Sequence, residues 1–140
     1  MTFYNMSQFV PYQGPGAEIR TGILGEDAKA CQIINLNDMT VYDAGDMNIG
    51  VVLTKTDQSV APGGDLSSGD KVYYIQAGED AVVNVLGTGT IALGSRIIAD
   101  QTAVGYASAS TTANDISKFG IGIAVAAKDG DGLVKVRLNR

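Results

Sequence analysis

Apolar and polar residues alternate with a period of two in short runs along most of the chain, and the clearest runs lie at its C-terminal end. From Phe119 to Val125, bulky apolar side chains alternate with glycine and alanine. From Leu133 to Leu138, apolar side chains alternate with Lys135 and Arg137. The sequence Asp-Gly-Asp-Gly at 129–132 supplies the turn residues between the two runs. This pattern predicts a β-hairpin.

The same alternation predicts further strands, separated by Gly/Asp-rich turns about every eight to twelve residues. The predicted strands cover residues 30–36, 47–55, 71–77, 81–86, 90–93, 96–99, 104–108, 119–126 and 133–138. A single helical turn is predicted at 112–118, with a loop as the alternative. Many short strands and little helix predict an all-β fold, a single compact β-barrel or β-sandwich.

The first twenty residues differ from the rest of the chain. Proline and glycine interrupt them too often for a helix or an inner strand, so we expect an extended N-terminal arm at 1–20, followed by one β domain at 21–140. The arm holds four aromatic residues, Phe3, Tyr4, Phe9 and Tyr12. Aromatic side chains contribute a large buried area, and free tails are usually polar. The arm is therefore expected to pack either on its own domain or on another subunit.

One face of the strand at 119–126 is almost bare. Gly120, Gly122 and Ala124 lie two residues apart and therefore share that face. Glycine within a strand often marks a place where another backbone comes close. We expect a neighbouring strand or a neighbouring subunit to approach there, and we include these three residues among the candidate contact residues.

Composition excludes most common catalytic chemistry. The 140-residue chain contains no histidine and one cysteine, Cys31. Histidine-based triads, imidazole metal sites, cysteine clusters and an intrachain disulfide are therefore excluded, and Cys31 is expected to be a small buried apolar residue. A phosphate loop at Gly89–Gly94 lacks its lysine, and a calcium loop starting at Asp129 would place Arg140 where glutamate is required. We predict no enzyme activity, cofactor or metal site.

Charge and hydropathy limit the partners. The net charge is −5, which argues against nucleic-acid binding through phosphates. No signal peptide or membrane-spanning run is present, so a protein made in the cytoplasm, without membrane association, is expected. Residues 1–115 hold 5 basic and 13 acidic side chains (net −8), whereas 116–140 hold 5 and 2 (net +3). The basic C-terminal strand either lies on a solvated face or docks on an acidic partner.

The second half of the chain resembles the small capsid decoration (cement) proteins of tailed bacteriophages. In that family, a turn of the kind seen in SSGDKVYYI and ALGSRIIAD enters a strand. A Gly/Ala-rich strand, a Gly/Asp turn and a final strand follow, as in GIGIAVAAKDGDGLVKVRLNR. The resemblance covers residues 66–140, and more loosely 41–65.

The resemblance implies a β-barrel-like virion protein that binds the outer surface of an assembled capsid and stabilises it through protein–protein contacts. It implies the major capsid protein as partner, and a homo-oligomer, with a trimer favoured. Phe3, Tyr4, Phe9 and Tyr12 are the expected capsid contacts, because aromatic residues are enriched at binding hot spots.

Three alternatives remain open at this point. Within the same class, the chain is a tail, spike or head-completion protein. A second possibility is a carbohydrate-binding β-module, in which Tyr73, Tyr74 and Tyr106 would supply the stacking surface. The third is an enzyme without histidine, which would require perturbed carboxylates clustered in a deep pocket.

Overall fold

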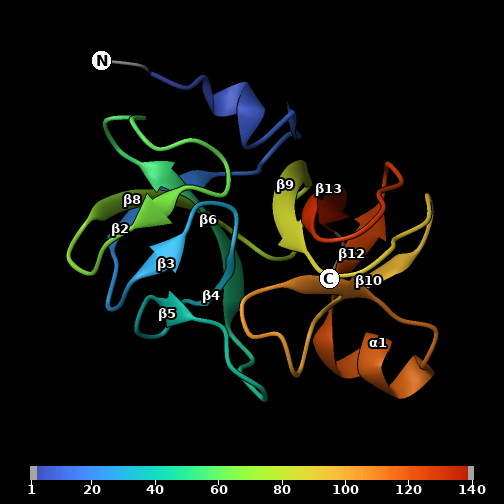
Figure 1. The fold of residues 1–140 in the computed structure, drawn as a ribbon. Coiled ribbons are helices and arrows are strands. Elements are labelled where there is room, and N and C mark those ends of the chain that lie inside the picture. The colour runs from blue at the N-terminus through green and yellow to red at the C-terminus, as the bar shows by residue number, and fades with distance from the viewer. Residues whose placement is uncertain (1–2, 139–140) are drawn as a thin grey trace.

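The structure is a computed structural model that describes residues 3–138. Residues 1–2 and 139–140, the outer ends of the predicted arm and of the predicted β domain, lie outside that range. Strands make up 42% of the structure and helices 7%, which confirms the all-β prediction. Figure 1 shows two side-by-side parts, which we name the sheet half (residues 17–80) and the barrel half (residues 81–138).

The sheet half contains an open five-stranded antiparallel sheet with the strand order β2-β8-β6-β4-β5, and a small β3–β7 pair. Its strands are β2 (Ile19–Ile23), β3 (Ala28–Lys29), β4 (Ile33–Asn35), β5 (Thr40–Val41), β6 (Ile49–Lys55), β7 (Asp65–Leu66) and β8 (Lys71–Gln76). The central strand β6 is buried on both faces from Ile49 to Thr54, which explains its nearly continuous apolar sequence.

The barrel half closes on itself. Strands β9, β11, β10, β12 and β13 pair in that order, and β13 pairs back to β9, so that the ring has no free ends. Its elements are β9 (Ala81–Gly87), β10 (Arg96–Ala99), β11 (Ala107–Ala109), α1 (Ala113–Phe119), β12 (Gly120–Ala124) and β13 (Gly132–Leu138). The alternation that predicted the terminal hairpin places Val134 and Val136 inside the barrel, opposite Val85 and Val83. The β12–β13 hairpin is confirmed.

The N-terminal segment completes the barrel wall. It contains a 3-10 helix, η1 (Met6–Gln8), and the short strand β1 (Tyr12–Gln13), which pairs with the start of β9. Further along the same edge of β9, the N–H groups of Asn84, Leu86 and Thr88 donate to the carbonyl oxygens of Phe9, Cys31 and Ala107. Three separate segments therefore cover this one edge.

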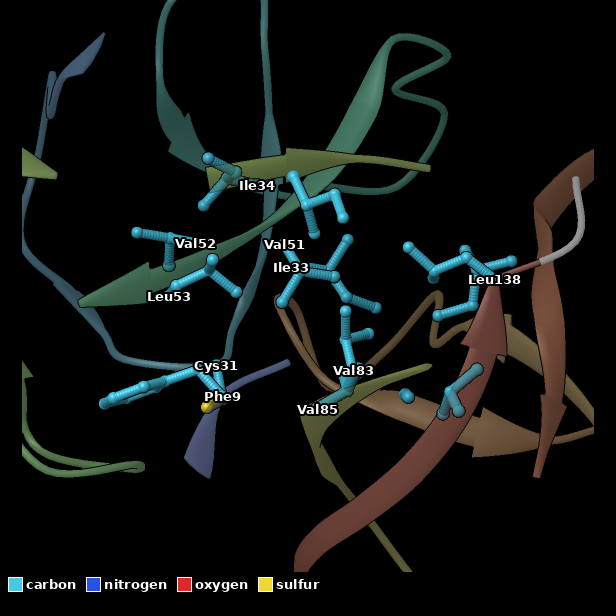
Figure 2. Close-up of a cluster of buried hydrophobic side chains, with 14 of the residues drawn as sticks. Phe9, Cys31, Ile33, Ile34, Val51, Val52, Leu53, Val83, Val85 and Leu138 are labelled. Carbon is cyan, nitrogen blue, oxygen red and sulfur yellow. The ribbon is translucent and has the colours of Figure 1, made fainter. Parts of the chain in front are cut away.

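One hydrophobic core runs through both halves. In Figure 2, Ile33 and Val51 of the sheet half point towards Val83 of the barrel half. A polar contact also joins the two halves: the Tyr42 hydroxyl, in the sheet half, accepts a hydrogen bond of 2.5 Å from the side chain of Gln101, in the barrel half. The two halves thus pack as one unit.

Several predicted boundaries were wrong. Residues 90–93 form only one isolated bridge, between Ile91 and Lys128, because the surrounding turns leave no length for a strand. The strand predicted at 104–108 lies at Ala107–Ala109. The predicted arm also contains the start of β2, whose apolar face is interrupted by Thr21 between Ile19 and Ile23. The helix at 112–118 is confirmed, shifted by one residue, as α1.

Candidate interaction surface

The outer face of the barrel carries a row of residues drawn from five strands. Residues that lie directly opposite one another on paired strands point to the same side of a sheet. The register places Arg96 opposite Ile123, Ile123 opposite Arg137, Arg137 opposite Val82, and Val82 opposite Tyr12. Residues from both ends of the sequence therefore meet on one surface.

Further exposed residues extend this row along β13. Leu133 and Lys135 alternate with the buried Val134 and therefore point outward. Val125 lies beside Lys135, to whose carbonyl oxygen its N–H donates at 2.9 Å. Both Val125 and Leu133 are 40% exposed. We call the following set the basic barrel face: Arg96, Ile123, Val125, Leu133, Lys135 and Arg137.

Arg137 fixes the border of this face. Its guanidinium donates a hydrogen bond of 2.8 Å to the Asp80 carboxylate and lies 5.7 Å from the centre of the Tyr12 ring. At that distance the cation is attracted by the ring. Tyr12 itself is 44% exposed. The structure thus brings one predicted contact residue, Tyr12, against the basic C-terminal strand.

Sequence reasoning identified the basic C-terminal strand but missed Arg96 and Val125 as parts of the same surface. Arg96 is 41 positions from Arg137 in the sequence, and only the β10–β12–β13 register brings the two residues into one row. Alternation within one strand shows which side chains point outward. It does not show which strand is the neighbour.

The other three aromatic residues of the predicted arm have different environments. Phe3 is 65% exposed, and Tyr4 is half-buried, with its main chain hydrogen-bonded to Gln58. Phe9 is 0% exposed and lies in the core, beside Cys31 in Figure 2. Phe9 therefore packs on its own domain, one of the two possibilities that the sequence left open. Phe3 and Tyr12 retain surface for a partner.

The bare strand face is explained by the chain itself. Gly122 and Ala124 lie opposite Leu138 and Val136 on the inner side of the barrel. A Cβ atom on Gly122 would collide with the carbonyl oxygen of Arg137, and one on Gly120 would collide with that of Ile116. The backbone that approaches this face is thus β13 and α1 of the same chain. Gly120 and Gly122 therefore leave room for these two backbone segments.

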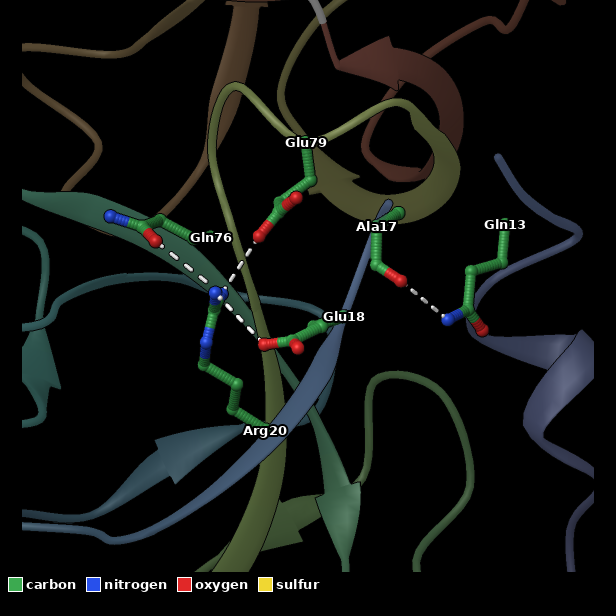
Figure 3. A network of polar contacts seen from close by, with 6 residues as sticks. All are labelled: Gln13, Ala17, Glu18, Arg20, Gln76 and Glu79. Atoms are coloured by element: carbon green, nitrogen blue, oxygen red, sulfur yellow. Dashed lines mark hydrogen bonds and ion pairs between the residues drawn. The ribbon is translucent and has the colours of Figure 1, made fainter. Parts of the chain in front are cut away.

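The connection between the two halves is held by paired charges. Glu79 and Asp80 lie in the loop between β8 and β9, and each forms an ion pair with an arginine. Arg20 donates to Glu79 at 2.8 Å and lies 3.1 Å from Glu18, as Figure 3 shows, whereas Asp80 pairs with Arg137. The hydrogen bond to Glu79 raises the pKa of Arg20. The two neighbouring carboxylates therefore bind one arginine from each half.

Cys31 is buried, as expected from the sequence for a single cysteine without a disulfide partner. Its side chain is 0% exposed, and burial raises the pKa of its thiol to about 12. A thiol that stays protonated is a poor nucleophile and a poor metal ligand. Its backbone has a φ of 74°, a left-handed conformation that is uncommon for a side chain of this kind.

An open groove of about 520 Å³ lies along the β3–β7 pair. The Lys29 ammonium donates to Asp65 at 2.7 Å on its wall, and this contact lowers the pKa of Asp65. The carboxylate of Asp27, also on the wall, accepts the N–H of Ser68. The pKa of Asp65 is thus lowered in this groove, whereas an acid–base mechanism would use a carboxyl group with a raised pKa.

The three tyrosines of the carbohydrate hypothesis do not form one stacking surface. Tyr73 and Tyr74 are consecutive residues of β8, so their rings point to opposite faces of the sheet. Both are partly buried against the core, and Tyr106 lies in the barrel half beside Thr88 and Asp131. The structure therefore does not bring these three rings together.

Within residues 3–138, no group of three or more His, Cys, Asp or Glu side chains could hold a metal ion. The one α-helix of that range, α1, is too short to cross a bilayer, and no described helix is long and apolar enough to do so.

No protein-family model matches the chain, and no curated protein matches it. Among solved structures, it is similar to the crystal structure of the head fiber gp8.5 N base in bacteriophage phi29. The two chains are 16% identical and superpose with a TM-score of 0.52, over 88% of this chain and 94% of the other. At this identity the similarity is one of fold.

Proposed function

We propose that this chain is a non-enzymatic structural protein of a bacteriophage virion, which binds the outer surface of an assembled capsid and stabilises it through protein–protein contacts. Its proposed partners are the major capsid protein and further copies of itself, with a trimer favoured. Its proposed location is the capsid surface, after synthesis in the host cytoplasm.

One observation carries the proposal. The chain shares its fold with a phage head fiber base over nearly the full length of both chains, although their sequences have diverged to 16% identity. Residues 66–140 also resemble the capsid decoration proteins of tailed bacteriophages in sequence. Both point to structural proteins on the outside of a phage head. A fold by itself does not fix a function, so the proposal requires a binding experiment.

The same comparison favours a second candidate within this class. The similar structure is the base of a head fiber, so this chain is alternatively the base of a fiber or another projecting virion part. A decoration protein covers the shell in many copies, whereas a part confined to the tail or to a vertex occupies only a few positions. Copy number therefore separates decoration from a part of that kind.

The experiment is co-sedimentation of the purified protein with shells from its source virus. Protein spun without shells is the control. Saturable binding near one copy per major capsid subunit, or three per local threefold axis, supports decoration. Saturation at only a few copies per particle favours a part confined to the tail or to a vertex. No binding at any concentration would contradict the proposed function.

A further inference from the structure

The basic barrel face combines positive charge with exposed apolar surface. Arg96 and Lys135 have no acidic partner among residues 3–138. Asp80, at the border of the face, is already paired with Arg137, and Asp131, in the turn before Leu133, accepts hydrogen bonds from Thr88 and Gly89. Between these charges lie Val125 and Leu133, both 40% exposed. Such a surface fits a partner that offers apolar side chains surrounded by carboxylates.

The sheet half of the same chain offers that chemistry. Residues 17–80 carry 4 basic and 11 acidic side chains (net −7), and no lysine or arginine occurs between Lys29 and Lys55. Residues 81–138 carry 5 basic and 4 acidic side chains (net +1). The two halves thus have opposite charge.

The acidic charge and an exposed apolar residue coincide at the loops around β5. Met47 is 66% exposed, and the same loops carry Asp38, Asp43 and Asp46, none of which has a basic partner within the described range. The two loops are tied together by a hydrogen bond of 3.0 Å between the side chains of Asn48 and Asn37. We call Asp38, Asp43, Asp46 and Met47 the acidic tip.

The acidic tip and the basic barrel face of one chain lie apart. In Figure 1 the loop between β5 and β6 extends below the sheet half, on the left, whereas β10, β12 and β13, which carry most of the basic barrel face, lie in the barrel half on the right. One chain therefore presents two complementary surfaces on different sides. The tip of one chain therefore does not contact the face of the same chain, whereas the tip of a second copy can reach it.

We propose that the basic barrel face binds the acidic tip of a second copy of this chain, in a head-to-tail contact. The inference rests on the homo-oligomer of the proposed function and names the surfaces that form it. A head-to-tail contact uses different surfaces on the two copies, and it closes into a ring when the rotation between copies permits. A threefold ring is the trimer proposed above.

The test measures the oligomeric state in solution by light scattering and sedimentation velocity, without shells. Wild-type protein is expected to associate at physiological salt, where the Debye length is about 8 Å, and to dissociate in 1 M salt, where it is about 3 Å. Lys135→Glu is expected to weaken association by about tenfold or more, because it places like charges opposite each other. The matched control is Lys71→Glu, an exposed lysine on β8, which is expected to change association by less than about twofold.

A mixing experiment tests the head-to-tail geometry. A face variant, Arg96→Glu/Lys135→Glu, and a tip variant, Asp38→Lys/Asp43→Lys, are each expected to be monomeric. Their mixture is expected to form a heterodimer, because the intact tip of the first fits the intact face of the second. Unfolding curves check that both variants fold.

The outcomes separate this inference from the proposed function. A wild-type protein that stays monomeric, or variants that associate as tightly as wild type, would overturn the head-to-tail contact. Monomeric variants whose mixture does not pair would overturn it as well. Because no shells are present, none of these results depends on capsid binding, which co-sedimentation tests separately.

Discussion

The main-chain N–H of Asn84, on β9, donates a hydrogen bond of 2.9 Å to the carbonyl oxygen of Phe9, and the Asn84 side chain donates one of 2.6 Å to the carbonyl oxygen of Gln8. Residues 75 positions apart are thereby paired as if they belonged to one sheet. An open strand edge invites association with other chains. The N-terminal segment is thus part of the barrel wall, and it covers an edge that would otherwise be exposed.

Phe9→Ala is expected to lower the free energy of unfolding by about 3–5 kcal/mol, because the ring is fully buried and its removal leaves a cavity. Chemical denaturation measures this loss. The control is Phe3→Ala, which removes a ring that is 65% exposed and is expected to change stability by less than about 0.5 kcal/mol. Equal losses for the two variants would mean that Phe9 does not occupy the core.

Gly122→Val is expected to prevent barrel closure or to lower the melting temperature strongly, because its Cβ would collide with the carbonyl oxygen of Arg137. The matched control is Gly22→Ala in β2, where the added Cβ meets the flexible end of Met39. Its effect is expected to stay near the cost of an ordinary surface change, about 0.5 kcal/mol. Thermal unfolding measures the melting temperatures of both variants and of wild type. An unchanged melting temperature for Gly122→Val would contradict the close approach of β13.

The sequence predicted the strands with clear alternation and failed where pairing decides the structure. The strand at Arg96–Ala99 was predicted at its observed bounds, and β6, β8 and β9 were each predicted within two residues. β2 was missed because Thr21 stands between Ile19 and Ile23 on its apolar face, and the strand forms through its pairing with β8. Strand order was not predictable either, because it depends on pairing between segments that are distant in the sequence. Register between distant segments leaves no local signal.

The candidate surface could be predicted only in part. Alternation in the last strand indicated that Lys135 and Arg137 point outward, and composition indicated that Tyr12 would contact something. The sequence could not show that Tyr12 stacks on Arg137, since β1 reaches β13 only across β9. Nor could it show that Phe9, three residues earlier, lies in the core.

The free energy of unfolding is expected to fall above about pH 9 in a way that depends on Cys31. Burial raises the pKa of the folded thiol to about 12, whereas the unfolded thiol ionises near its ordinary value. The stabilisation is therefore fully present below the unfolded pKa and is lost as the pH rises towards 12, by about 1.4 kcal/mol per pH unit. Denaturation of wild type and Cys31→Ala at several pH values measures the difference. Parallel pH profiles for the two proteins would contradict it.

Tyr42→Phe is expected to lower stability by about 0.5–1.5 kcal/mol, because the buried hydroxyl accepts a hydrogen bond from Gln101 across the two halves. A double-mutant cycle with Gln101→Ala isolates this contact, since either single change removes it. The expected coupling is of the same size. Additive effects of the two substitutions would show that the contact contributes nothing.

Phe3→Ala is expected to weaken shell binding by about tenfold or more without changing stability, if the proposed capsid attachment is correct, since an exposed aromatic ring is a typical binding anchor. Deletion of the whole arm would not test this contact, because it would also remove Phe9 from the core. Co-sedimentation over a range of protein concentrations gives the affinity. The matched control is Leu93→Ala, which removes a side chain that is 68% exposed on the loop between β9 and β10. If the wild-type protein binds shells and Phe3→Ala binds them equally tightly, the attachment surface does not include Phe3. The exposed Tyr12 is then the next residue to change.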